Sequence, residues 1–264
     1  MTTPTTLPYS LERTISINAP PETVFRFFTD PERWAKWWGK GSTVEPKPGG
    51  DIYIHHPGGI ESRGNVVSID EPKQFVFTYG FVGGNPIPPG SSLVTISLEP
   101  MSGATRLTLR HELPDEKVRD EHQQGWRFQL SLFANVVADE IVPEADKIVD
   151  LWLSAWSEPD PDVRATILEE IAAPSVTMRD RFSNLDGVED VLPHIAASQR
   201  FMPGLRLRRS GKVRHCQGMI LADWVTEGPD GSTQGSGTNV FELGPDGLIE
   251  SVTGFWTSPG GSGT

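Results

Sequence analysis

The chain has 264 residues, of which 36% are hydrophobic and 22% charged, a globular composition whose length suits two domains of ordinary size. The net charge is −12: residues 1–143 carry 13 basic and 17 acidic side chains, and residues 144–264 carry 10 and 18. Neither half has the basic excess that neutralises phosphates or anionic lipids. We therefore expect neither nucleic acid nor a membrane as a partner.

The cysteine, the histidines and the N-terminal sequence further restrict the class of protein. Cys216 is the sole cysteine, which excludes an intrachain disulfide and a thiolate zinc cluster. Met1 and its neighbours lack the basic and apolar regions of a signal peptide, and no apolar run approaches the ~20 residues of a membrane span. The histidines at 55, 56, 111 and 122 lack the spacing of a metal site. We predict a cytoplasmic protein without metal or cofactor.

The first half begins with a strand and two helices. Residues 11–18 alternate between apolar and polar side chains, as a half-buried strand does. Two prolines then open a helix, and Asp30-Pro31 opens the next one, with Asp30 placed to cap it. That second helix carries three tryptophans on one face, at 34, 37 and 38.

The rest of the first half predicts a sheet and one long helix. Glycine- and proline-rich turns separate strand-like runs, which favours an antiparallel meander. These runs are 51–56, 60–69, 75–81, 93–98 and 105–112. A helix begins at Pro114-Asp115, with an apolar stripe formed by Trp126, Leu130, Phe133 and Val137. Such a stripe must be buried against the concave face of the sheet.

The first half resembles the START-like (SRPBCC) superfamily, in the branch of homologues of the ninety-kilodalton heat-shock ATPase activator. The resembling segments are 15–25, 28–34, 64–70 and 122–126. The resemblance implies a helix-grip fold, a curved antiparallel sheet around a long C-terminal helix, with a cavity for apolar ligands between them. It implies no particular reaction. We predict that aromatic side chains line this cavity, namely Trp37, Trp38, Phe77, Trp126 and Phe133.

The second half predicts three helices and a bent sheet. Helices are expected at 145–157, from Asp160 or Pro161 onward, and at 187–200; strands are expected at 175–180, 205–213, 219–227, 233–243 and 248–255. The two Gly-Pro-Asp-Gly segments are strong turn signals between strands. The fold class is therefore α+β in both halves. We place the domains at 9–142 and 145–257, meeting near Val142-Pro143.

The second half resembles the nuclear-transport-factor-two-like superfamily, which includes ketosteroid isomerases and SnoaL-type polyketide cyclases. The resembling segments are 152–160, the strand ending at Asp180, Gly187 at a helix start, and 238–249. The resemblance implies a cone-shaped α+β barrel, often dimeric through the outer sheet face. A homodimer through this domain is therefore compatible with the sequence.

The resemblance places Asp180 where the general base of the family sits. The positions of the family's two oxyanion donors hold Trp152 and Asn239, which donate hydrogen bonds but carry no acidic proton. We predict these three as the catalytic candidates, and Trp156 and His194 as ligand-binding residues. The alternatives stay open. Asp180 can be a strand-end carboxylate paired with a neighbouring arginine or a helix N-terminus, and Asn239 a satisfied polar group. Trp152 can be core or pocket wall, and His194 surface or core.

Three functions remain compatible with the sequence. The first is binding of hydrophobic small molecules in both pockets by a carrier, sensor or sequestering protein. The second is an isomerase- or cyclase-like enzyme with Asp180 as base. The third is a chaperone ATPase partner. We rank it lowest, because the activators carry an additional domain ahead of the START-like one, whereas this chain begins directly with the START-like strand.

Overall fold

The computed structural model describes residues 7–142 and 144–257. The chain divides into two compact units that part between Ala138 and Asp139. Pro143, at which the sequence places the domain junction, lies outside the described residues. The domain limits 9–142 and 145–257 therefore stay a prediction.

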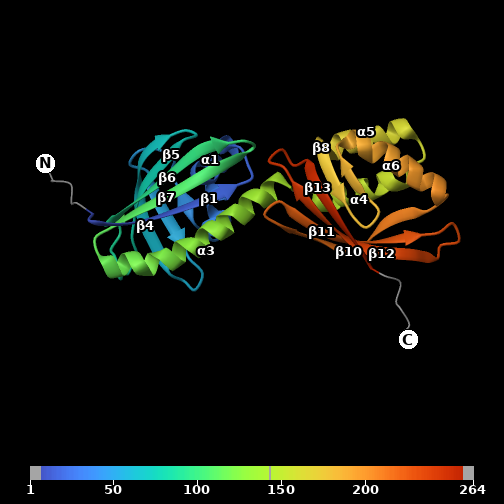
Figure 1. Cartoon of the computed structure of the whole chain (residues 1–264). Helices are drawn as coiled ribbons and strands as arrows, with labels where there is room; N and C mark the ends of the chain where they lie inside the picture. The colour runs from blue at the N-terminus through green and yellow to red at the C-terminus, as the bar shows by residue number, and fades with distance from the viewer. Residues whose placement is uncertain (1–6, 143, 258–264) are drawn as a thin grey trace. The chain divides into compact units, whose positions relative to one another are not determined.

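The N-terminal domain contains a seven-stranded antiparallel sheet (Figure 1). The order is β1-β7-β6-β5-β4-β3-β2: strands β2 to β7 form a meander, and β1 is added at one edge by pairing with β7. The strands are β1 (Tyr9–Ile17), β2 (Thr43–Val44), β3 (Asp51–His55), β4 (Glu61–Asp70), β5 (Gln74–Tyr79), β6 (Ser92–Met101) and β7 (Ala104–Leu113). Only the two-residue β2 has no counterpart in the sequence-based prediction.

Two short helices follow β1, α1 (Pro21–Thr29) and α2 (Pro31–Trp38). The predicted cap is present, since the Asp30 carboxylate accepts the backbone N–H groups of Glu32 and Arg33 at 2.8 and 3.2 Å. A side-chain acceptor at this position satisfies donors that the first helical turn leaves unpaired. All three tryptophans of α2 are buried.

The long helix α3 (Glu116–Ile141) supplies the other wall of the N-terminal core. Trp126, Leu130, Phe133 and Val137 are buried, as the stripe predicts. The Phe133 ring stacks on Phe28 at 5.0 Å and meets Trp37 edge-on at 4.9 Å. The helix therefore packs on an aromatic layer contributed by α1 and α2.

The C-terminal domain begins with helices α4 (Ala145–Ser157) and α5 (Pro161–Ile171), and α6 (Val188–Phe201) follows later. Asp160 caps α5 through the backbone N–H groups of Asp162 and Val163. The helices pack on the buried face of the sheet, whose core includes Trp152, Leu168, Ile195 and Phe241.

The C-terminal sheet has six strands in the order β10-β11-β12-β13-β8-β9 (Figure 1). They are β8 (Ala172–Arg179), β9 (Asn184–Asp186), β10 (Arg206–Cys216), β11 (Met219–Glu227), β12 (Thr233–Leu243) and β13 (Ile249–Thr257). Strands β13 and β8 are parallel and the other pairs antiparallel. The described pairing leaves β9 and β10 as edges.

Both domains have the α+β architecture that the sequence predicts, a helix-grip sheet followed by three helices on a bent sheet. Short turns connect many of the neighbouring strands in both sheets. At Gly228–Gly231, for example, Gly231 has φ of +78° and donates to the Gly228 carbonyl. No helix within 7–142 or 144–257 is long and apolar enough to cross a membrane.

Candidate functional sites

The C-terminal domain contains a cavity of about 380 Å³ between its helices and its sheet. The wall is mostly aromatic and aliphatic, with a few polar groups. It is lined by Trp152, Trp156, Met178, Asp180, Phe182, Ser183, His194, Ser198, Gln199, Met202, Leu205, Leu207, Trp224, Thr226, Asn239 and Trp256. All five residues that the sequence assigns to this pocket are among them.

Asp180 directly follows β8 and is held by two donors. Its Oδ1 accepts the backbone N–H of Phe182 at 2.7 Å, and its Oδ2 accepts the indole N–H of Trp256 at 3.1 Å. The neighbouring Arg179 pairs with Asp186 instead, and the Arg181 guanidinium lies over the Phe182 ring. Among the described residues Asp180 therefore has no cationic partner.

Asn239 lies on β12 and is 6% exposed. Its Oδ1 accepts the indole N–H of Trp224 at 2.9 Å. An indole nitrogen only donates, so the atom facing it must be the amide oxygen. The NH₂ group of Asn239 is therefore the end of the amide left to donate to a ligand.

Gly254 on β13 brings Asp180 and Asn239 to the same place. It pairs with Asn239 across the ladder, and the preceding Thr253 pairs with Arg179. A Cβ atom at position 254 would lie 3.0 Å from Cβ of Asp180 and 3.1 Å from Oδ1 of Asn239. The carboxylate and the amide thus converge over this glycine, because no side chain stands between them.

A second polar group of the cavity contains His194 and Ser183. The Nε2 atom of His194 lies 3.1 Å from Oγ of Ser183, and the imidazole meets the Trp156 ring edge-on at 5.9 Å. The indole N–H of Trp156 is buried and has no hydrogen-bond partner among the described residues. These groups can orient a bound molecule.

Gln199, on the same wall, is fully engaged by the protein. Its NH₂ group donates to the carbonyls of Trp156 and Glu158, and its Oε1 accepts from Arg164. Arg164 is only 3% exposed and donates to the Glu158 carbonyl as well. Gln199 therefore closes the wall instead of offering free donors.

Trp152 lies on α4 at the base of the cavity and is fully buried. Its ring meets Phe241 edge-on at 6.0 Å. The ring contributes apolar surface to the cavity and to the core behind it.

The N-terminal domain has its own cavity of about 390 Å³. It lies between α3, the meander and the end of α2. It is lined by Trp38, His56, Pro57, Ile60, Tyr79, Phe81, Pro86, Glu121, His122, Gly125, Trp126, Phe128 and Gln129. Trp38 and Trp126 are thus on the wall, where the sequence expects them.

The other three aromatic residues assigned to this cavity lie elsewhere. Trp37, Phe77 and Phe133 are fully buried in the aromatic core and do not line the cavity. The Trp37 indole N–H donates to the Phe27 carbonyl at 3.2 Å, and Phe133 packs against α1. The sequence predicts correctly that these side chains point into the domain, but they pack against other aromatic rings and not against the cavity.

A chain of hydrogen bonds runs behind the N-terminal cavity. The Trp126 indole N–H donates to Nδ1 of His111 at 2.9 Å, so the His111 proton is on Nε2, 2.8 Å from Oγ of Ser92. Ser92 donates to the Tyr79 carbonyl. Burial, with a smaller contribution from nearby His122, holds the pKa of His111 well below its ordinary value. His111 is therefore neutral and fully bonded.

A second cluster joins three polar side chains at the cavity edge. Nε2 of His56 lies 2.9 Å from Oγ of Ser62, which donates to the Tyr79 hydroxyl at 3.2 Å. Burial raises the pKa of Tyr79 to about 12 and lowers the pKa of His56. The tyrosine stays a protonated donor at neutral pH.

These polar groups are the functional candidates that sequence reasoning missed. His111 shares the inward face of β7 with Leu107, Leu109 and Leu113, so period-two alternation could have identified it as buried. His56 lies far from it in sequence and His122 lies on the following helix, and only the fold brings the three together. The histidine rings of 111 and 122 are 5.1 Å apart. No group of three potential ligands is arranged to hold a metal ion in the described parts of the chain.

A family model matches part of the chain. Residues 18–138 match the model of the family described as activator of Hsp90 ATPase homolog 1-like protein. This agrees with the resemblance to START-like proteins seen in the sequence. No curated protein matches the chain in sequence.

Several solved structures are similar to parts of the chain. A SnoaL-like family protein from Agrobacterium tumefaciens is 26% identical over 42% of this chain and 96% of its own, with a TM-score of 0.41. CalU16 from Micromonospora echinospora is 22% identical over 51% and 79%, also with a TM-score of 0.41. The Aha1 dimer from Colwellia psychrerythraea is 19% identical over 46% and 90%, with a TM-score of 0.40.

Proposed function

We propose that this protein binds small, largely apolar molecules in two cavities, one in each domain. The observation that supports this most is the pair of cavities itself, about 380 and 390 Å³ with mostly apolar walls. Ligand sites of proteins are typically roughly 300–1,000 Å³, apolar, with a few polar groups that set orientation. Both cavities meet this description.

Native mass spectrometry after gentle purification tests this proposal. We expect bound small molecules that dissociate on mild activation, or, if purification strips them, uptake of added ethylnaphthalene. A chain that carries no ligand and takes up no ethylnaphthalene would contradict the proposal.

A second candidate function, acid/base catalysis, is favoured by the setting of Asp180. Its carboxylate lines an apolar cavity, has no ion pair among the described residues and converges with Asn239 over Gly254. In this reaction Asp180 would remove a proton from the carbon beside a ketone. The NH₂ group of Asn239 would donate to the carbonyl oxygen as it becomes an enolate oxygen. The protonated Asp180 would then return a proton to the same carbon, or to the γ-carbon in a ketone with a β,γ double bond.

The donors limit how fast such a reaction can be. Neither Asn239 nor Trp152 carries an acidic proton that can move toward the enolate oxygen, unlike a tyrosine or a protonated carboxyl group. We expect slow turnover. The test is exchange of the α-protons of tetralone for deuterium, followed by NMR. Asp180→Asn should abolish exchange while ethylnaphthalene still binds in the N-terminal cavity; exchange that survives this change rules out Asp180 as the base.

Protein partners have weaker support. The family name matched by residues 18–138 suggests a chaperone ATPase, but no feature of the described residues favours that partner over a small molecule. A homodimer through the outer face of the C-terminal sheet would use the surface of Phe255, which is 59% exposed. Sedimentation velocity with Phe255→Ser tests it, and a wild-type monomer at high concentration would refute it.

A further inference from the structure

We propose that the N-terminal cavity selects an apolar molecule that carries a hydroxyl group, which donates to Nε2 of His122 and accepts from the hydroxyl of Tyr79. This deepens the proposed binding function, on which it rests. It concerns the hydrogen-bonding groups of His122 and Tyr79, which line this cavity.

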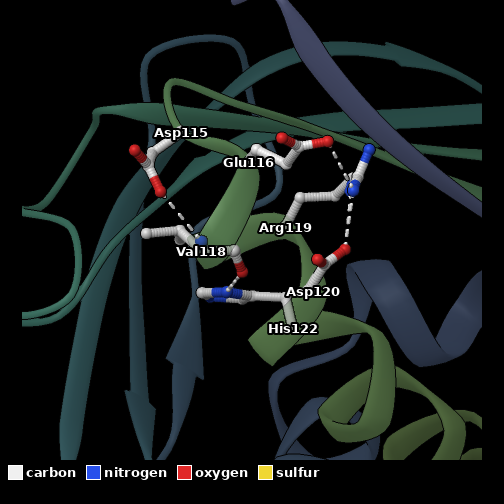
Figure 2. A network of polar contacts seen from close by, with 6 residues as sticks. All are labelled: Asp115, Glu116, Val118, Arg119, Asp120 and His122. Atoms are coloured by element: carbon white, nitrogen blue, oxygen red, sulfur yellow. Dashed lines mark hydrogen bonds and ion pairs between the residues drawn. The ribbon is translucent and has the colours of Figure 1, made fainter.

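The first observation is the tautomer of His122. Its Nδ1 lies 2.8 Å from the carbonyl oxygen of Val118, one turn earlier on α3 (Figure 2). A carbonyl oxygen only accepts, so the proton is on Nδ1 and the lone pair is on Nε2. Asp115 holds this turn by accepting the Val118 N–H at 3.1 Å. On the same turn Arg119 contacts Glu116 and Asp120.

The second observation is that Nε2 of His122 has nothing to accept. The atom is buried, and no described residue donates to it. Leaving a buried acceptor unpaired costs about 1–3 kcal/mol, and native structures usually fill such a position with a ligand or water. Burial also lowers the pKa of His122, which keeps Nε2 an acceptor at neutral pH. His122 lines the cavity, so a bound molecule can supply the missing donor.

The third observation supplies the complementary donor. Ser62 donates to the oxygen of Tyr79, and Nε2 of His56 lies 2.9 Å from Oγ of Ser62 and 3.4 Å from the Tyr79 hydroxyl. In the tautomer that has the His56 proton on Nε2, this nitrogen donates to Ser62 and cannot accept from Tyr79, so the Tyr79 proton is available to a ligand. The Tyr79 ring meets the His122 ring edge-on at 6.1 Å. The cavity therefore presents one donor and one acceptor from neighbouring rings. A hydroxyl group has both functions in a single atom.

Other polar groups near this point are already occupied. Both ring nitrogens of His111 are bonded, to Trp126 and Ser92. Glu121 is exposed and lies 3.9 Å from Lys117. Gln129 donates to the Trp37 carbonyl. Most of the remaining wall is apolar and includes the exposed side chains of Ile60 and Phe128. A hydroxyl on an apolar body therefore fits this cavity better than an ion.

The test compares naphthol with methoxynaphthalene, which keeps the ring and the oxygen but cannot donate. Binding is followed through the ring-nitrogen signals of ¹⁵N-histidine by NMR, a readout local to this cavity. We expect naphthol to shift the Nε2 signal of His122 and to bind at least about tenfold more tightly, since a hydrogen bond to a buried acceptor is lost otherwise. Methoxynaphthalene should leave that signal close to its free position.

Variants assign the effect to the two residues. His122→Phe should remove most of the preference. Tyr79→Phe should weaken both compounds and keep the preference, because the oxygen of each can accept from Tyr79. His215→Phe, at a histidine that lines neither cavity, should leave the His122 response unchanged. The wild-type comparison alone decides the matter if a variant does not fold. Equal affinities, with the His122 signal unmoved by naphthol, overturn the hydroxyl proposal but keep ligand binding. Absence of binding by both compounds overturns the proposed function of this cavity as well.

Discussion

The indole N–H of Trp224 donates a 2.9 Å hydrogen bond to Oδ1 of Asn239. Trp224 lies on β11 two residues beyond Ala222, the ladder partner of Asn239, so both side chains share one face of the sheet. This contact fixes the orientation of the amide. It makes the NH₂ group the donor available to a carbonyl in the C-terminal cavity.

Loss of that indole should weaken recognition of carbonyl compounds. Trp224→Phe keeps an aromatic ring but lets the Asn239 amide rotate, so we expect the preference for acetonaphthone over ethylnaphthalene to fall about fivefold, equivalent to roughly 1 kcal/mol. The indole N–H signal of Trp256 reports on this cavity by NMR. Trp126→Phe, in the other domain, serves as the control. An unchanged preference in Trp224→Phe would show that Asn239 is not oriented in this way.

Gly254→Ala should separate Asp180 from Asn239. The new methyl group would lie 3.0 and 3.1 Å from atoms of these two residues, closer than ordinary contacts allow. Overpacking of this kind costs typically 1–3 kcal/mol. Urea unfolding should show this loss, and deuterium exchange of tetralone should fall with it. Gly83→Ala, where nothing lies within 4 Å, should change stability by no more than about 0.5 kcal/mol. Equal stability of the two variants would contradict the predicted crowding.

The two helix caps should report on the two domains separately. Asp30 caps α2 and Asp160 caps α5 by the same arrangement of two backbone donors. Each change to alanine should cost about 0.5–2 kcal/mol. Because the compact units part between Ala138 and Asp139, we expect each variant to lower only one of two unfolding transitions in calorimetry. A single transition shifted equally by both variants would mean that the domains unfold together.

The buried histidines should make the N-terminal domain sensitive to acid. Burial lowers the pKa of His56, His111 and His122 in the folded state from the ordinary value of 6.5. Between the folded and unfolded pKa values the unfolded chain binds more protons, so stability rises with pH in that window and falls as pH drops below about 6.5. Thermal unfolding between about pH 7.5 and 5 measures the slope.

A matched variant attributes this slope to His111. Gln has an acceptor for Trp126 and a donor for Ser92 but does not titrate, so His111→Gln should reduce the pH dependence of the N-terminal transition. The C-terminal transition provides the internal reference. If the slope were unchanged, protonation of His111 would not be its source.

Local sequence signals predicted much of the fold. Asp30 caps the helix that it was expected to cap, the helix expected from Asp160 or Pro161 begins at Pro161, and α4, β11 and β12 have the predicted bounds. The missed strands β2 and β9 have two and three residues, too few for a period-two pattern to appear. Their pairing depends on neighbouring strands that are distant in sequence.

The candidate sites were predictable only in part. The family resemblance placed Asp180, Asn239, Trp152, Trp156 and His194 in one pocket, and the structure brings them together. Periodicity shows that a residue points inward but not what lies in front of it. Trp37 and Phe133 therefore meet other rings while Trp38 and Trp126 meet the cavity.

The hydrogen bonds that orient the polar groups could not be read from the sequence. Trp224 and Trp256 hold Asn239 and Asp180 across strands, and the tautomer of His122 depends on the carbonyl of Val118. Each of these contacts requires the three-dimensional register of the strands or the turn of the helix.

The stoichiometry of apolar ligand binding tests the central claim, two cavities in two domains, most directly. Native mass spectrometry with ethylnaphthalene should show two molecules per chain. Gly125→Phe should fill the N-terminal cavity and Ser198→Phe the C-terminal one, since each residue lines one of them, and each variant should bind a single molecule. One molecule in the wild type, or two in either variant, would contradict the claim.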